Sequence, residues 1–232
     1  MIAMSPIIRL PEKIFSFMNV SASKENILKK IRKALSISTP LPFPNSEGTS
    51  SIFQPSQQEL EIEFAQQCTK LQGKFIYCLN STELRVQLNS LIQHNKWTRI
   101  FCCEQQLTTM LQDDMQISCP HDDLATCDAS ITSCEFLIAR TGTIVLSAAQ
   151  ESGRTVSVYA PIHICIAYTD QLVYDIRDAL QLLREKYQHQ FPSLITLATG
   201  PSRTADIEKT LVVGVHGPKE VYVFLVDSKQ YE

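Results

Sequence analysis

The amino-acid sequence predicts an α/β fold, a mixed and mostly parallel β-sheet covered by helices, and three observations predict it. Short apolar runs alternate with amphipathic segments between residues 56 and 122, which is the order found in βαβ units. The run "EVYVFLVD" near the C-terminus is apolar on both alternating faces, as expected for a central strand. The 232 residues are 44% hydrophobic, which is enough to bury a full core.

The charge balance limits the classes of partner. Lysine and arginine total 21 against 24 aspartates and glutamates, so the net charge is -3 at pH 7. This composition gives no basic footprint for nucleic acid and no polybasic membrane patch, and no apolar run reaches the length of a membrane span. We therefore expect small molecules or proteins as partners.

The N-terminal region predicts no secretory signal. Arg9, Glu12 and Lys13 interrupt the apolar stretch that such a signal requires. We expect a cytoplasmic protein in which residues 1–17 form an N-terminal tail.

Residues 18–55 are expected to hold an amphipathic helix and an extended arm. The segment "SKENILKKIRKAL" places Ile27, Ile31 and Leu35 on one stripe, with Ser23 as the N-cap. The proline- and serine-rich stretch that follows Leu35 predicts no regular structure. A helix tethered in this way could fold back on its own domain, which is the commoner outcome, or dock on a partner.

An α/β domain is predicted for residues 56–232. Ser56 and Glu59 form a candidate capping box for its first helix, which Gly73 would end. The next elements are a strand, a helix with Leu84, Leu88 and Leu91 facing inward, a second strand and a short helix: "KFIYCL", "STELRVQLNSLIQHN", "RIFCC" and "QQLTTMLQ".

The pattern changes after Asp122, where the sheet is expected to become mixed. Two β-rich runs flank the polar segment 150–154, which predicts a hairpin, and "IHICIAY" predicts a buried strand. A helical stripe follows and stops before Pro192; its members are Val173, Ile176, Leu180, Leu183 and Tyr187. "LITLATGPSR" predicts a strand that runs into a glycine turn.

The eight cysteines do not predict a metal site. None forms a C-x-x-C pair, and several lie inside apolar runs such as "RIFCC" and "IHICIAY". Buried reduced thiols fit this pattern better than disulfides, zinc or an iron–sulfur cluster. No cofactor and no metal are therefore predicted in this chain.

Two loops have a composition suited to ligand binding, which in open α/β sheets occurs beyond the carboxyl ends of strands. Thr141, Gly142 and Thr143 form a hydroxyl-rich turn that could bring backbone N–H groups to an anion, or an ordinary turn. The second loop follows a strand and is expected to open a helix or helical turn. It comprises Gly200, Pro201, Ser202, Arg203, Thr204, Ala205 and Asp206.

In the second loop, the hydroxyls of Ser202 and Thr204 and the planar cation of Arg203 match a carboxylate or phosphate. The alternative, equally weighted, is structural: Thr204 caps a turn and Arg203 pairs with Asp206 or Glu208.

Two histidines are candidates for acid–base chemistry, and their sequence contexts differ. His216, between the glycines of "GVHGP", is the better candidate for acid–base work because its loop could approach the Gly200 turn. His163 inside "PIHICIAY" is more typical of a hydrogen-bonded core residue. The sequence contains no catalytic triad, P-loop or dinucleotide fingerprint.

Four motifs, in this order, resemble the lactate utilization protein C family, the LUD-domain proteins: "TGTIVLSA", "PIHICIA", "TGPSRTADIE" and "GVHGPKEVYVFLVD". The resemblance extends from about Asp122 to the C-terminus. It implies a fold similar to the glucosamine-phosphate isomerase, ribose-phosphate isomerase and CoA-transferase group. It also implies a role in oxidation of L-lactate to pyruvate, with iron–sulfur clusters carried by two partner proteins.

The resemblance also implies site residues. We expect a small anionic ligand at the junction of the Thr141 and Gly200 loops, with Arg203 holding the anion, His216 accepting a proton and Asp206 orienting one of them. Two positions depart from the family pattern: Arg140 stands where an acid is expected, and Ser130 where a glycine is expected.

Two alternatives stay open. The first is a non-catalytic protein that binds a nucleotide or sugar phosphate and docks on an iron–sulfur partner through the helix of residues 18–35. The second, a stand-alone isomerase or transferase, lacks a recognisable nucleophile.

Overall fold

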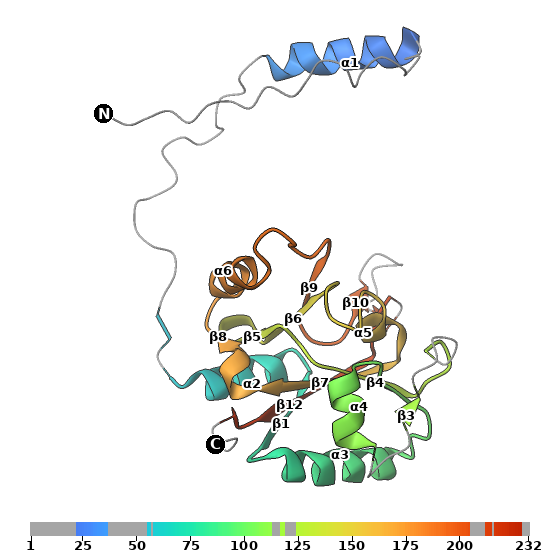
Figure 1. Ribbon diagram of the computed structural model, residues 1–232, viewed down its shortest axis with the longest axis vertical. Coiled ribbons are helices and arrows are strands. Elements are labelled where there is room, and N and C mark those ends of the chain that lie inside the picture. The colour runs from blue at the N-terminus through green and yellow to red at the C-terminus, as the bar shows by residue number, and fades with distance from the viewer. Residues whose placement is uncertain are drawn as a thin grey trace. The chain divides into compact units, whose positions relative to one another are not determined.

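The computed structural model describes residues 22–36, 55–56, 58–112, 117–118, 124–204, 212–214 and 216–228 (Figure 1). The chain divides into two compact units, Met1–Gln54 and Pro55–Glu232. The predicted tail of residues 1–17 and nearly all of the proline- and serine-rich arm lie outside the described residues. None of the described helices is long and apolar enough to cross a membrane.

The first unit contributes one described helix, α1 (Ala22–Leu35). The predicted amphipathic helix is therefore confirmed. The expectation that Ser23 is its N-cap is wrong, because the helix already includes Ala22. The apolar side chains of the predicted stripe are exposed: Ile27, Ile31 and Leu35.

The second unit has the predicted α/β architecture, built around a six-stranded sheet. The strand order is β1-β12-β7-β4-β2-β3, and every neighbouring pair is parallel. The strands are β1 (Lys74–Cys78), β2 (Ile100–Phe101), β3 (Ile117–Ser118), β4 (Ala129–Thr132), β7 (Ile162–Tyr168) and β12 (Glu220–Val226). As predicted, β12 is a central strand, and it lies between β1 and β7.

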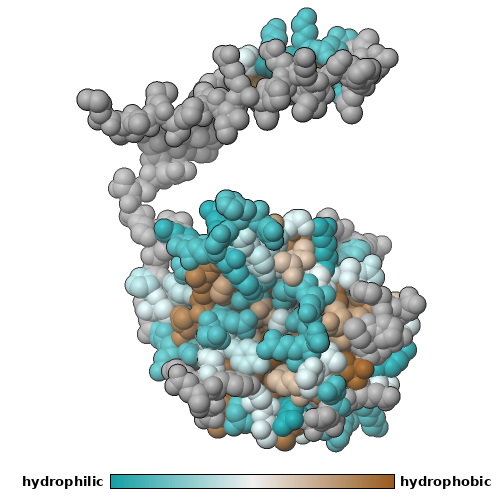
Figure 2. Space-filling model, in the orientation of Figure 1, coloured by the Kyte–Doolittle hydropathy of each residue, from teal (hydrophilic) through white to brown (hydrophobic). Residues whose placement is uncertain are grey.

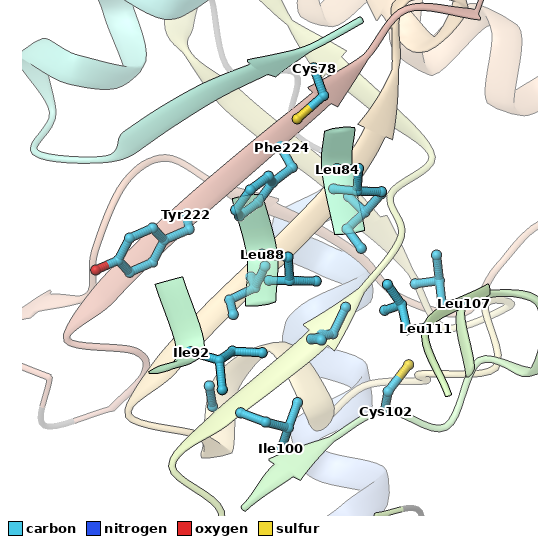
Figure 3. Close-up of a cluster of buried hydrophobic side chains, with 14 of the residues drawn as sticks. Cys78, Leu84, Leu88, Ile92, Ile100, Cys102, Leu107, Leu111, Tyr222 and Phe224 are labelled. Atoms are coloured by element: carbon cyan, nitrogen blue, oxygen red, sulfur yellow. The ribbon is translucent and has the colours of Figure 1, made fainter. Parts of the chain in front are cut away.

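One face of this sheet is covered by α3 (Ser81–Asn95) and α4 (Gln105–Leu111). The α3 helix has the predicted bounds, and the side chain of Asn80 caps it by accepting from the backbone N–H of Glu83. Figure 3 shows the resulting core, in which Leu84 and Leu88 lie beside Phe224 of β12. Ile92, which the predicted stripe omitted, is buried in the same core.

The other face packs against α2 (Leu60–Lys70) and a second, four-stranded sheet. That sheet has the order β8-β5-β6-β9, with two antiparallel pairs and one parallel pair. Its strands are β5 (Phe136–Ile138), β6 (Thr143–Ser147), β8 (Leu172–Val173) and β9 (Ile195–Ala198), and α6 (Ile176–Tyr187) covers its far side. The mixed character predicted for the fold is therefore found in the second sheet.

Three local predictions in this unit are wrong. The hairpin around residues 150–154 does not form, because the second β-rich run becomes the short helix α5 (Val156–Tyr159), held to β4 by the Ser130 hydroxyl, which donates to the Val156 carbonyl. Val173 belongs to β8 because Asp175 caps α6 two residues later.

The third concerns the start of α2. Ser56 and Glu59 form no capping box, because the Ser56 hydroxyl donates instead to the Glu63 carboxylate at 2.7 Å.

The face of the α/β unit that Figure 2 shows is mainly hydrophilic, with small separate apolar areas.

Candidate functional site

The structure places the two predicted loops side by side. Strands β6 and β9 pair antiparallel, with Ile144 opposite Ala198, so the turn before β6 meets the turn after β9. The hydroxyl of Thr143 lies 2.9 Å from that of Thr199 and 2.7 Å from that of Thr141. The predicted junction of the Thr141 and Gly200 loops therefore exists.

Both loops press against the backbone of α2, and glycine makes this possible. Gly142 and Gly200 have φ angles of 60° and 74°, in the left-handed region that favours glycine. A Cβ atom on Gly142 would lie 2.6 Å from the backbone nitrogen of Cys68, and one on Gly200 would lie 2.7 Å from the Leu71 carbonyl oxygen. The N–H of Gly142 donates to the Ala139 carbonyl within the turn, so this N–H is not available to an anion.

Arg203 is placed against the C-terminus of α2. Its Nη2 donates to the Leu71 carbonyl at 2.9 Å, and the side chain is otherwise exposed. A cation at this position also complements the helix dipole. Arg203 and Thr204 form β10 (Arg203–Thr204), which pairs antiparallel with β11 (Val212–Val213), so the expected helix or helical turn does not begin at these residues. Asp206 lies outside the described residues.

The His216 loop approaches the Gly200 turn, as predicted. The backbone N–H of Ser202 donates to the Pro218 carbonyl at 2.9 Å, and the N–H of Gly214 donates to the Ser202 carbonyl at 3.0 Å. A Cβ atom on Gly217 would lie 2.8 Å from the Ser202 Cβ. These contacts hold Ser202 between the two ends of the loop.

A pocket of about 450 Å³ opens beside this loop. Its lining comes from the end of α5, the residue before β7 and the loop before β12: Val158, Tyr159, Pro161, Gly214, His216, Gly217 and Lys219. The pocket therefore lies at the amino ends of β7 and β12, whereas ligand sites were expected at the carboxyl ends of strands. The chain passes through β10 and β11 before it reaches the amino end of β12, and the loop at that end lines the pocket.

Lys219 is the cation of this pocket, and the sequence reasoning missed it. Its stem packs on Gly214, where φ is 79° and a Cβ atom would lie 2.2 Å from the Lys219 Cγ. Its backbone N–H donates to the Pro161 carbonyl at 2.7 Å. The signal that could have found it is its position directly after the Gly-Pro turn of "GVHGPK".

His163 is a core residue, as its sequence context indicated. It is fully buried, its Nε2 lies 2.9 Å from the Thr132 hydroxyl, and burial lowers its pKa to about 4. Nδ1 has no hydrogen-bond partner within the described part of the chain. A neutral imidazole in this position belongs to the interior of the sheet.

The two departures from the family pattern have structural partners. Ser130 tethers α5, as described above, and Arg140 forms an ion pair through Nε with Asp175, the buried N-cap residue of α6. The Arg140 cation therefore supports the start of α6.

Of the cysteines that the structure describes, all but Cys103 are buried. Burial raises the pKa of Cys68, Cys78 and Cys102 to about 11, which keeps these thiols protonated near neutral pH. Among the described residues, no group of three or more cysteine, histidine or acidic side chains could hold a metal ion.

Comparison with known proteins gives a match to one family model and to several similar proteins. The family model described as the LUD domain matches residues 109–226. The chain is 29% identical over 223 residues to lactate utilization protein C of Anoxybacillus flavithermus, an alignment that covers 90% of this chain and 100% of that protein.

Other matches are more local. Lactate utilization protein C of Deinococcus radiodurans is 35% identical over 118 residues, or 50% of this chain and 54% of the relative. That of Bacillus subtilis is 38% identical over 103 residues, or 43% of each. The chain thus spans about half the length of these two relatives.

Among solved structures, a DUF162 family protein from Deinococcus radiodurans matches with a TM-score of 0.58 and 21% identity, over 75% of this chain and 99% of that one. This match supports the fold.

Proposed function

The chain belongs to the LUD domain family, and we propose that it acts in the oxidation of L-lactate to pyruvate and binds a small carboxylate in the pocket beside His216 and Lys219. The names of its relatives support a role in lactate utilization. The observation that carries the choice of site is that a histidine and a lysine line one pocket whose loop is shaped by two glycines.

Lys219 would bind the carboxylate. An ammonium group is a compact point charge that suits a small anion, and a pocket of about 450 Å³ has room for one. Because Gly214 gives the lysine stem a fixed path, the ammonium would be partly oriented before the ligand arrives.

His216 would accept the hydroxyl proton of lactate. Histidine is the side chain that serves most often as a general base in enzymes. Oxidation of lactate to pyruvate breaks the O–H and Cα–H bonds and releases two protons and two electrons. His216 would take the hydroxyl proton and the second proton would pass to solvent. The two electrons would pass to iron–sulfur centres that we assign to partner proteins. In this division of labour, the chain supplies binding and proton transfer.

Arg203 does not bind the anion in this proposal, although the sequence led us to expect that role. Its contact with Leu71 ties the Gly200 turn to α2, and it does not line the pocket. We therefore assign the anion to Lys219, and to Arg203 the support of the turn that carries Ser202.

The second candidate function is a non-catalytic protein that binds a nucleotide or sugar phosphate. The glycine-rich loop from Gly214 to Gly217 favours it, because backbone N–H groups in such loops bind phosphate oxygens. Turnover of L-lactate by the chain with its co-purified partners would distinguish catalysis from binding alone, and His216→Asn should remove the turnover while leaving binding.

The test is thermal stability of the purified chain against L-lactate, pyruvate, phosphate, nucleotides and CoA. A ligand at 100 times its Kd stabilises the native state by about 2.7 kcal/mol. We expect a carboxylate to raise Tm, Lys219→Gln to remove the increase, and the matched control Lys70→Gln, an exposed lysine in the last turn of α2, to keep it.

Phosphate or a nucleotide acting in place of a carboxylate would favour the second candidate. A carboxylate effect that survives Lys219→Gln would reject the assignment of the pocket. If the isolated chain does not respond, the same panel is applied to the chain with its co-purified partners, and no response there would reject the proposal.

A further inference from the structure

Helix α1 gathers three apolar residues on one side, and four of its five cations lie outside that side. Successive helical residues are separated by about 100°, so Ile27, Ile31 and Leu35 fall within an arc of about 80°. Leu28 borders this arc. Lys29 and Lys33 lie on the far side of the helix, and Lys30 and Arg32 lie between the two sides. Lys24, in the first turn, falls within the apolar arc.

The charges in α1 are almost all of one sign. The helix contains five basic residues and one acidic residue, Glu25, which pairs with Arg32 through exposed side chains at 3.4 Å. The net charge of -3 for the whole chain conceals this segregation. The overall charge balance therefore does not describe this helix, which carries a local excess of four positive charges.

The apolar stripe of α1 is exposed to water, which is unfavourable, and a surface that covers the stripe would remove this free-energy cost. Ile27, Ile31 and Leu35 are 55%, 47% and 79% exposed. A helix of 14 residues is marginal in water without burial of its apolar side. A surface that covers the stripe would therefore stabilise both the helix and the complex.

We propose that α1 binds the surface of an anionic lipid bilayer, with its apolar stripe inserted at the level of the headgroups. Helices with one apolar side, lysine and arginine on the other and low overall hydrophobicity bind in this way. The proposal concerns α1 alone and does not depend on the function proposed for the pocket.

The spread of the cations favours a bilayer over a protein groove. A groove contacts the apolar stripe and its rims, which leaves cations on the far side, such as Lys29 and Lys33, without a role. A helix with its side chains is about 10 Å across, similar to the Debye length at physiological salt. Every cation of α1 would therefore feel the field of an anionic surface, and each Lys or Arg near it strengthens binding.

The experiment is co-sedimentation of the full chain with vesicles of phosphatidylcholine, with and without phosphatidylglycerol. We expect binding to the anionic vesicles, weak binding to the neutral ones and loss of binding as salt rises. Ile31→Asp should abolish binding because it places a charge in the centre of the stripe. Lys29→Gln with Lys33→Gln should weaken it by about tenfold or more.

The matched control removes two exposed cations from the α/β unit, Lys70 and Arg184, by substitution with glutamine. This variant has the same net charge as the double variant in α1 and should bind the anionic vesicles as the unmodified chain does.

Three results would overturn the proposal. They are absence of binding to anionic vesicles, equal binding to neutral vesicles, and equal loss of binding in the control variant. If vesicles do not bind and Ile31→Asp instead releases a co-purifying protein, the stripe is a protein-docking surface.

Discussion

Glu135 should contribute more to the stability of the α/β unit than other acidic side chains at its surface. Its side chain is 1% exposed and accepts hydrogen bonds from Lys186 Nζ at 2.7 Å, the Tyr187 hydroxyl at 2.7 Å and the Ser147 hydroxyl. These contacts join β6 and α6 to the segment that precedes β5. Glu135→Gln keeps the shape of the side chain but turns an amide toward donors that need an acceptor.

The expected cost of Glu135→Gln follows from these contacts. A hydrogen bond to a charged group contributes about 1.5–3 kcal/mol, and breaking a buried ion pair costs about 3–5 kcal/mol. The Lys186 side chain is 56% exposed, so solvent screening reduces the ionic part. We expect destabilisation of about 3 kcal/mol, or roughly 6–12 °C in Tm for a unit of this size.

The pH dependence gives a second, independent signature. Burial alone would raise the pKa of Glu135, but hydrogen bonds from Lys186, Ser147 and Tyr187 outweigh it, and the net pKa lies below the usual value. A carboxyl with a lowered pKa stabilises the fold fully above its unfolded pKa of about 4.3. The stability difference between the unmodified chain and Glu135→Gln should therefore be complete at pH 7 and shrink as the pH falls through the folded pKa.

Urea unfolding followed by circular dichroism, at pH 7 and at several acidic pH values, measures both effects. The matched control is Glu185→Gln, an exposed acid of α6 whose contact is with Gln181 on the same helix, and it should change the free energy of unfolding by less than about 0.5 kcal/mol. The reasoning is refuted if Glu135→Gln is no more destabilising than this control, or if its effect does not diminish in acid.

Two further predictions concern the candidate site. Gly214→Ala should cost about 1–2 kcal/mol for its left-handed backbone and also weaken ligand binding, because the new Cβ would displace the Lys219 stem; a ligand-induced Tm shift that remains full would contradict this packing. Arg203→Ala should lower the free energy of unfolding by about 1 kcal/mol, through loss of its bond to Leu71, and leave the ligand-induced Tm shift in place. Loss of that shift would instead return Arg203 to the role of anion ligand.

Elements with consistent local signals were predictable from the sequence. Helix α3 has a cap at Asn80 and a regular apolar stripe, and the structure reproduces its bounds. Strand β12 is apolar on both faces and lies in the interior of the sheet. In both cases, local propensity and burial favour the same conformation.

Elements decided by distant contacts were not predictable in the same way. The segment Thr155–Val158 contains three β-branched residues and has a high propensity for strand. Val156 to Tyr159 nevertheless form α5, whose first carbonyl accepts from Ser130, 26 residues away. Lys219 was missed because its importance depends on the parallel pairing of β7 with β12. That pairing brings α5 and Pro161 beside the loop before β12, and no local pattern encodes it.

The loop before β12, which lines the pocket, is exposed, but hydrogen bonds at its ends fix its backbone. The pocket loop leads directly into β12, which lies between two parallel neighbours and is buried from Val221 to Val226. At its start, the N–H groups of Lys219 and Glu220 both donate to the Pro161 carbonyl, so the backbone of Lys219 is fixed while its side chain faces the pocket. Ser202 joins the two ends of the loop, because its carbonyl accepts from the N–H of Gly214 and its own N–H donates to the Pro218 carbonyl. A ligand that binds there would meet a preorganised site, which reduces the entropic cost of binding.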